Sequence, residues 1–386
     1  MGVYLDHNAT TPMREEVRAL MDSLVDEKLG NPSSLHASGR RARQLIDSAR
    51  EQAAAALGVH EDALTFTSGG TEANNLALLG VMRSAPGPGA LVSTAIEHSS
   101  VLGPAERLAQ EGHRCTLVAV DRSGQPDFEA LCEAAVGARL VSVMAGNNEI
   151  GVCPPLHGLA ERLPRGQQGR RPWLHTDAAQ AVGRIAVPWG ELDLASLSAH
   201  KFGGPPGAGL LVHRVGVSLA PLLHGGGQEL GLRPGTEHVA AIAGTALALE
   251  LACRERELFA RRVHGLACSL WQRLSRRLPA LELLGPTLNM EGPQPDRLPG
   301  TLNILAHDVD GKVLVTRLDL EGLEVSAGSA CASGSIEASH VLLALGFDES
   351  RARAGLRLSL GRTTSAEDVN SAVEILGRVL GEARAR

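Results

Sequence analysis

Short apolar runs alternate with longer helix-like stretches through the first two-thirds of the chain. Residues 63–67 are predicted to form a strand, and residues 71–82 the helix that follows it. A second helix is predicted at 100–112, and further strands at 90–96, 114–120, 139–144, 173–176, 192–198 and 208–212. This alternation indicates an α/β protein with a mostly parallel sheet covered by helices on both faces. Ligands of such sheets bind at the carboxyl ends of the strands.

The pattern changes after the last of these strands. Residues 239–278 are rich in Ala, Leu and Arg and predict one long helix, and the Pro/Gly-rich residues 285–300 predict a connecting loop. Beyond the loop a small α+β unit is predicted from residues 301–306, 310–320, 356–360 and 365–380. A chain of 386 residues is long enough for one large domain with a smaller one attached.

Composition and charge narrow the classes of function. A hydrophobic content of 44% with 21% charged residues is ordinary for a globular protein with a sizeable core. Aromatic residues make up only 2%, which disfavours base-stacking platforms for single-stranded nucleic acid. The net charge is −6 without a basic tract, so neither nucleic acid nor an anionic membrane is expected as the main partner. The six cysteines show neither CxxC nor a zinc-type Cys/His spacing, so no metal site is predicted.

The N-terminal residues MGVYLDHNATTP lack the basic and apolar regions of a secretory signal. The longest nearly apolar stretch, residues 239–249, is too short to span a bilayer. We therefore expect a cytoplasmic protein in which most of the cysteines are small core residues.

Lys201 stands between two strand-like runs, in the sequence LASLSAHKFGGPPGAG at 194–209. It is one of only three lysines in a chain that otherwise takes its positive charge from arginine. Desolvation makes an amine nucleophilic toward carbonyl groups, which suits a lysine that forms a Schiff base. Taken alone, an exposed turn is the commoner environment of a lysine, because lysines are rarely buried.

Three further signals follow predicted strands, and each also has a purely structural interpretation. The SGGT motif at 68–71 opens a helix, and its glycines let backbone N–H groups approach a phosphate, but a helix cap after a turn explains it as well. Asp177 could keep a pyridinium nitrogen protonated, or cap the helix that follows. His98 could stack on an aromatic ring, or have a structural role only.

The order of these motifs along the chain resembles the cysteine desulfurases of the class V aminotransferase superfamily. The resemblance runs from LDHNATTP to the final helix, through SGGTEANNLAL, EHSSV, NNEIG, HTDAAQAVG, SAHKFGGP, GGGQE, RPGTEHV, SAGSACASGS and LRLSLGR. It implies the fold type I of enzymes that depend on pyridoxal 5′-phosphate (PLP). A large PLP-binding domain is then expected at 14–250, and a small domain made of 1–13 and 251–386.

The resemblance also implies a role for each motif residue. Lys201 would form the Schiff base with PLP, Asp177 would pair with the pyridine nitrogen, and His98 would stack on the ring. Gln180 and Asn148 would contact the oxygen side of the ring. The phosphate would be held by Gly70, Thr71, Ser198, His200 and, from the neighbouring subunit, Thr236. A homodimer with shared sites is therefore expected.

The expected reaction is removal of sulfur from L-cysteine, which gives L-alanine and a persulfide on the enzyme. Asn31 and Arg357 would bind the substrate carboxylate, Arg357 as a bidentate fork. Cys331 lies among Gly, Ala and Ser residues that offer little packing, and it would attack the substrate sulfur. Its persulfide would pass to an acceptor protein, such as an iron–sulfur scaffold that could bind a cluster at Cys331, or to a thio-modifying enzyme.

Three alternatives remain open at this point. Selenocysteine lyases share several of the same motifs, and sulfur and selenium substrates differ little in shape. A plain aminotransferase would leave Cys331 without a role. A non-catalytic docking partner that keeps the fold is disfavoured because Lys201, Asp177, His98 and Cys331 are all present.

Overall fold

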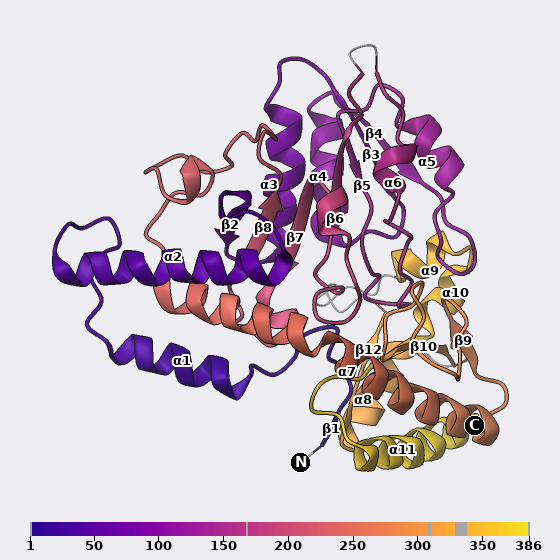
Figure 1. Cartoon of the computed structure of the whole chain (residues 1–386). Coiled ribbons are helices and arrows are strands. Elements are labelled where there is room, and N and C mark those ends of the chain that lie inside the picture. The colour runs from indigo at the N-terminus through magenta and orange to yellow at the C-terminus, as the bar shows by residue number, and fades with distance from the viewer. Residues whose placement is uncertain (1, 167–168, 307–309, 329–337, 385–386) are drawn as a thin grey trace.

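A seven-stranded sheet forms the centre of the larger part of the molecule in the computed structural model, which describes residues 2–166, 169–306, 310–328 and 338–384 (Figure 1). The strand order is β2-β8-β7-β6-β5-β3-β4. The strands are β2 (Leu64–Thr67), β3 (Ala90–Thr94), β4 (Arg114–Val118), β5 (Leu140–Ser142), β6 (Trp173–Asp177), β7 (Leu194–Ser198) and β8 (Gly209–His213). β8 pairs antiparallel with both of its neighbours, and the ladders that join β7, β6, β5, β3 and β4 are parallel. The predicted mostly parallel sheet is confirmed.

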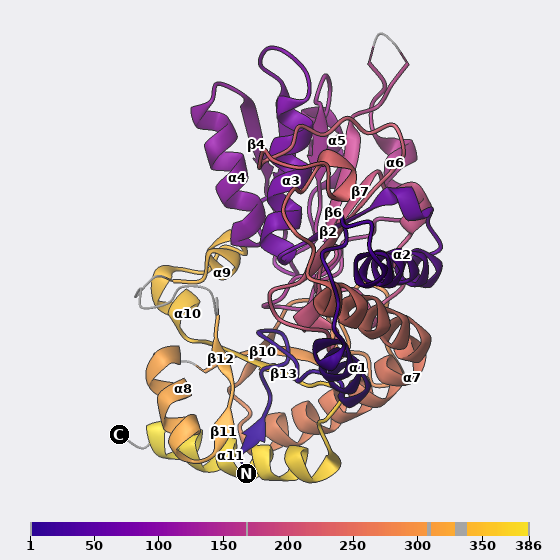
Figure 2. The ribbon, with the colours of Figure 1, turned by 90° about the vertical axis from the view of Figure 1, so that its left-hand side faces the viewer.

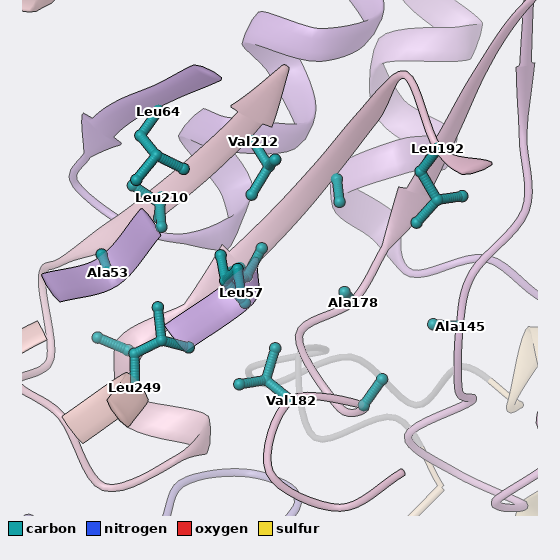
Figure 3. Close-up of a cluster of buried hydrophobic side chains, with 14 of the residues drawn as sticks. Ala53, Leu57, Leu64, Ala145, Ala178, Val182, Leu192, Leu210, Val212 and Leu249 are labelled. Carbon is teal, nitrogen blue, oxygen red and sulfur yellow. The ribbon is translucent and has the colours of Figure 1, made fainter. Parts of the chain in front are cut away.

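Helices cover both faces of this sheet because its strands are apolar on both sides. Leu211 of β8 packs in one cluster with α3 (Gly70–Arg83) and α4 (Ser99–Gln110). Its neighbours Leu210 and Val212 point the other way, into the cluster shown in Figure 3. That cluster holds α2 (Ala37–Leu57), α5 (Phe128–Ala134), α6 (Leu159–Arg162) and the first half of α7 (Val239–Arg277). The alternation follows the two-residue period of a strand.

The second part of the molecule is built around a four-stranded antiparallel sheet of order β12-β13-β10-β9. Its strands are β9 (Glu282–Leu284), β10 (Thr301–Leu305), β12 (Ser326–Ala327) and β13 (Gly355–Ser359). The N-terminal β1 (Val3–Tyr4) pairs with β11 (Leu323–Glu324), so the start of the chain lies beside its last third (Figure 2). The remaining helices are α1 (Glu15–Asp26), α8 (Gly311–Leu320), α9 (His340–Ala344), α10 (Glu349–Arg353) and α11 (Ala366–Arg384), with short 3₁₀ turns η1 (Glu61–Ala63), η2 (Trp189–Glu191), η3 (Ala199–Lys201) and η4 (Glu229–Gly231).

The helix α7 contributes to both apolar cores. Leu249 and Ala252 belong to the core of the large sheet, whereas Val263 and Leu270 belong to the core of the small one. The change of core along α7 supports a proposed domain boundary near residue 250. The division into 14–250 and 1–13 plus 251–386 stays a prediction.

His175 lies in the middle of the large sheet, and because its ring is buried we expect the protein to lose stability in acid. The ring is completely buried, with Nδ1 2.8 Å from Ser142 Oγ and Nε2 3.0 Å from Ser196 Oγ. Burial lowers the pKa of His175 to about 4 from its ordinary 6.5. At pH values between about 4 and 6.5 the unfolded chain binds a proton at this residue that the folded chain does not. The free energy of unfolding therefore falls as the pH falls, by on the order of 2–3 kcal/mol from this group.

Chemical denaturation of wild type and His175→Gln from pH 7 to 4 measures this contribution of His175. The decline should be smaller in the variant, and equal declines would contradict the assignment.

Candidate active site

A cavity of about 430 Å³ opens at the carboxyl-terminal edge of the large sheet. Its walls are the segments that follow β2, β3, β5, β6 and β7, because the carboxyl ends of these strands share that edge. Gly207 and Ala208 approach from the opposite direction, since the antiparallel β8 begins there. Ten of the predicted site residues line the cavity, namely Gly70, Thr71, His98, Asn148, Asp177, Gln180, Ser198, His200, Lys201 and Arg357.

The glycine-rich turn between β2 and α3 brings backbone amides to the cavity. Gly69 has a φ of +153°, a conformation that favours glycine, and it precedes the first residue of α3. A Cβ on Gly209 would lie 2.5 Å from the carbonyl carbon of Gly69, so β8 passes too close for a side chain. Ala73 N donates to Gly69 O at 3.0 Å. By helix geometry, the backbone N–H groups before Ala73 have no acceptor within the helix. This end of α3 can therefore bind an anion such as a phosphate.

Lys201 ends the turn η3, directly after β7, and its amine is held by the N-terminal segment. Nζ donates to Asn8 O and to Ala9 O, both at 2.7 Å. The neighbouring His200 also faces that segment, with Nδ1 3.1 Å from Thr10 Oγ1. Burial, and then the charge of Lys201, lower the pKa of His200 to about 4, so its ring is neutral at physiological pH. The amine therefore lies in a half-buried setting, held by two backbone oxygens, and not on an exposed turn.

Asp177 and His98 are joined by two polar side chains that the sequence motifs did not single out. Asn74 Nδ2 lies 2.8 Å from Asp177 Oδ2 and 2.8 Å from Ser100 Oγ. Ser100 Oγ lies 2.7 Å from His98 Nδ1, which also accepts the Ser100 backbone N–H at 3.1 Å. A backbone N–H can only donate, so Nδ1 is the unprotonated nitrogen and the proton of the neutral ring is on Nε2. Asp177 also accepts from Ala179 N at 2.9 Å, so it caps the following turn as well.

Glu97, directly before His98, is a buried carboxyl group beside the cavity. Its Oε1 accepts from Thr94 Oγ1 at 2.8 Å and from Met144 N at 2.9 Å. Burial raises the pKa of Glu97 to about 8, against the lowering effect of these two hydrogen bonds. The group is therefore mostly protonated at neutral pH and adds little negative charge next to Asp177.

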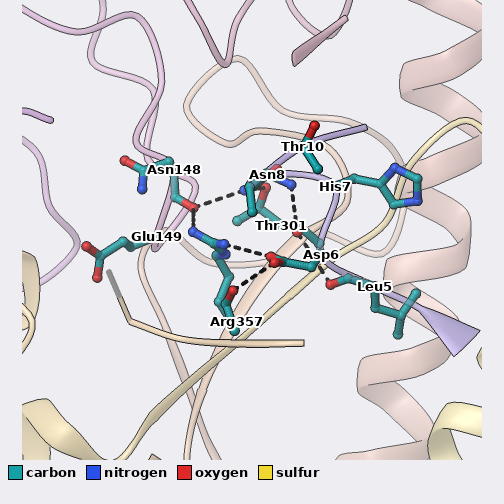
Figure 4. Close-up of polar contacts among 12 residues, drawn as sticks. Leu5, Asp6, His7, Asn8, Thr10, Asn148, Glu149, Thr301 and Arg357 are labelled. Carbon is teal, nitrogen blue, oxygen red and sulfur yellow. Dashed lines mark hydrogen bonds and ion pairs between the residues drawn. The ribbon is translucent and has the colours of Figure 1, made fainter. Parts of the chain in front are cut away.

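Arg357 reaches the cavity from β13 of the small sheet, and it is fixed by two acceptors (Figure 4). The side chain is 1% exposed. Nη2 donates to Asp6 Oδ1 at 2.7 Å, and Nη1 donates to Asn148 O at 3.2 Å. Within the described residues, Nε of Arg357 is buried and has no hydrogen-bond partner. The guanidinium group is thus oriented and still has hydrogen atoms to offer to a ligand.

Two of the predicted residues that the structure describes do not line this cavity. Asn31 is exposed in the connection between α1 and α2, where its Oδ1 accepts from Ser33 N at 2.9 Å. Thr236 is exposed after η4. Cys331 lies outside the described residues. The roles assigned to all three stay predictions.

The N-terminal segment and several buried polar residues of the site were missed by the sequence argument. Asn8 accepts from Lys201 and from Gln180 Nε2 through its backbone oxygen, a role that no side-chain motif reveals. Asp6, Arg184, Asn74 and Glu97 are the other missed residues. Four of these residues had a signal, because Asp6 and Asn8 belong to the motif LDHNATTP, Glu97 to EHSSV and Asn74 to SGGTEANNLAL.

The described residues contain neither a metal-binding cluster nor a membrane-spanning helix. Within them, no group of three or more His, Cys, Asp or Glu side chains is placed to hold a metal ion. None of the helices described is long and apolar enough to cross a membrane.

Comparison with known proteins agrees with this geometry. The family model described as "Aminotransferase class-V" matches residues 3–371. The cysteine desulfurase IscS of Dictyoglomus turgidum is 41% identical, over 99% of this chain and 95% of the relative. A solved structure of a NifS-like protein has a TM-score of 0.89 at 34% identity and covers 99% of this chain and 100% of that one. A structure of SspA in complex with cysteine has a TM-score of 0.76 at 30% identity, over 93% of this chain and 98% of that one. The chain belongs to the class V aminotransferase family and, within it, to the PLP-dependent cysteine desulfurases.

Proposed function

We propose that this protein removes sulfur from L-cysteine, releases L-alanine and carries the sulfur as a persulfide on Cys331. One observation supports the proposal above all others. A single cavity brings together the amine of Lys201, the carboxylate of Asp177, the anion-binding turn before α3 and the guanidinium group of Arg357. These are the four groups needed to hold an aldehyde cofactor with a phosphate and a ring nitrogen, next to an amino acid carboxylate.

The residues present fit PLP. The turn at Gly70, with Ser198 and His200 opposite, would hold the phosphate, and Asp177 would face the ring nitrogen. Oε1 of Gln180 is buried and, in the described part of the chain, has no hydrogen-bond partner, so it lacks a donor that a cofactor hydroxyl group can supply. Lys201 would hold the cofactor covalently. When bound, PLP withdraws electrons from the substrate carbon atoms.

The protein's own residues bind the substrate and move its protons. Arg357 would take the carboxylate, through the hydrogen atoms that Asp6 and Asn148 leave. His98, with Nε2 as its protonated nitrogen, can give a proton to a group in the cavity, and Ser100 keeps the ring in that tautomer. At Cys331 an S–S bond would form as the C–S bond of the substrate breaks, and the carbon keeps the electron pair and is protonated. No external oxidant or reductant is needed to form the persulfide.

The test is direct. Purified protein supplied with L-cysteine and a thiol reductant should release alanine and sulfide in equal amounts. Borohydride should abolish both the activity and the yellow colour of the cofactor, because it reduces the bond to Lys201. Release of neither product would contradict the proposal and would favour the non-catalytic docking partner.

Selenocysteine lyase is the less favoured alternative, because the curated relatives are named cysteine desulfurases. A preference for L-selenocysteine, with little activity on L-cysteine, would reverse this choice. The acceptor protein, which could be an iron–sulfur scaffold, and the cytoplasmic location stay predictions.

The proposed homodimer gives a mixing prediction. Thr236 is exposed and does not line the cavity of its own chain, which supports a role in the site of a second chain. Lys201→Ala and Thr236→Trp should each be inactive alone. A heterodimer of the two would have one site with both lesions and one with neither, so activity should return to about half of the wild-type rate. Mixtures that stay inactive despite proven subunit exchange would contradict the shared site.

A further inference from the structure

Arg184 is a buried guanidinium group without a carboxylate partner among the described residues. The side chain is 5% exposed and follows the turn after β6. It donates to Asn8 Oδ1 and, at 3.3 Å, to His7 O, and both acceptors are neutral. Burying a charge without a counter-charge lowers the stability of the folded protein by several kcal/mol. Such a group is therefore a candidate for a functional role.

A chain of hydrogen bonds leads from Arg184 through Asn8 and Asn148 to Arg357. Asn8 Nδ2 donates to Asn148 O at 3.0 Å, and this oxygen also accepts from Arg357 Nη1 (Figure 4). The two arginines are close enough that the charge of Arg357, after burial itself, lowers the pKa of Arg184 to about 10. Arg184 therefore remains charged at neutral pH.

Asp6 is the only carboxylate that pairs with Arg357 in the described part of the chain. Its Oδ2 also accepts from Ser326 Oγ at 2.9 Å, so Asp6 orients Arg357 and holds β12 at the same time. The nearby Glu149 turns its carboxylate away, to Ser339 Oγ at 2.5 Å. Counted without Glu149, whose carboxylate binds Ser339, the side chains of Arg184, Arg357 and Asp6 carry one net positive charge.

A substrate carboxylate at Arg357 would meet the negative charge of Asp6 on the same guanidinium group. With Arg357 alone, two carboxylates would share one positive charge in a buried site, which is unfavourable. We propose that Arg184 offsets the charge of Asp6, so that Arg357 can hold Asp6 and the carboxylate of one amino acid together. Arg184 is then a positioning residue: the electrostatic field of its charge acts on Asp6 and Arg357, and its side chain does not touch the substrate. The inference rests on the proposed function, since it assigns the substrate carboxylate to Arg357.

The inference is tested by comparing L-cysteine with its methyl ester, which lacks the negative charge. Arg184→Gln keeps a donor for Asn8 Oδ1 and removes the charge. It should lower kcat/KM for L-cysteine relative to the ester by about tenfold, mainly through KM, because one unit charge is lost from a low-dielectric site. Arg184→Lys should keep the wild-type ratio.

The double variant Asp6→Asn with Arg184→Gln gives the sharpest result, because it restores one net positive charge. The ratio of kcat/KM for L-cysteine to kcat/KM for the ester should return most of the way to its wild-type value. Two merely structural lesions would instead have additive effects on that ratio. Should Arg184→Gln fail to fold, Asp6→Asn alone decides, since its ratio should rise above that of wild type. Arg297→Gln is the matched control. Arg297 is equally buried and donates to the carbonyl oxygens of Pro286 and Thr301, so its loss should reduce stability and leave the ratio unchanged.

Equal losses for acid and ester in Arg184→Gln, or a double variant without recovery, would overturn the inference. Wild-type protein that releases no alanine from L-cysteine would overturn the proposed function instead. The two failures are therefore distinguishable in one set of assays.

Discussion

Lys201→Ala is expected to abolish turnover of L-cysteine, by more than about a thousandfold, while the fold stays intact. The amine lies between two backbone oxygens of the N-terminal segment and faces the same cavity as Asp177 and Arg357. No other lysine lines this cavity, within the residues that the structure describes, so no neighbour can replace it. The assay is alanine formation at saturating L-cysteine, with thermal unfolding as the check of the fold.

The state of the cofactor separates this prediction from a general loss of structure. The variant keeps the phosphate-binding turn and Asp177, so PLP should still bind, but gel filtration should remove it because the covalent bond is missing. Lys28→Ala is the matched control, since Lys28 is exposed in the connection that follows α1, and it should keep both activity and cofactor. Normal turnover in Lys201→Ala would overthrow the assignment of the cofactor site.

Much of the large sheet could be predicted from local apolar runs, and its one reversed strand could not. The run at 173–176 became β6 (Trp173–Asp177), and the run at 208–212 became β8 (Gly209–His213). The direction of β8 is set by its pairing with β2 and β7, which are far away in the sequence. The apolar alternation of a strand is the same in either direction, so the sequence carried no signal for the reversal.

The residues that follow the strands could also be predicted, because the fold brings the carboxyl ends of parallel strands to one edge. Asp6, Asn8 and Arg184 were missed for a physical reason. Asp6 meets Arg357 across 351 residues of sequence, and Arg184 meets Asn8 across 176. Such contacts depend on how the N-terminal segment passes between the two sheets, which local propensity does not determine. The partner of Arg357 is therefore a result of tertiary structure alone.

Cys331→Ser is expected to abolish persulfide formation and to leave binding of PLP and L-cysteine in place. The binding steps use Lys201 and Arg357, whereas only a thiolate accepts sulfur at neutral pH. Burial raises the thiol pKa of Cys115, Cys153, Cys253 and Cys268, which makes these cysteines poor nucleophiles. The measurements are the change in cofactor absorbance on adding L-cysteine, and mass spectrometry of the protein for one added sulfur atom.

The choice of thiol is decided by a matched pair of variants. Cys268→Ser removes a buried thiol whose Sγ lies 3.4 Å from His264 Nε2, and it should gain the sulfur atom as wild type does. Cys331→Ser should show the absorbance change without the mass increase, because the substrate binds but its sulfur has no acceptor on the protein. A persulfide that forms at the wild-type rate on another cysteine would show that Cys331 is not the sulfur carrier. In that case the cavity would still bind the substrate, and the search for the carrier would turn to Cys132, which is half-buried in α5.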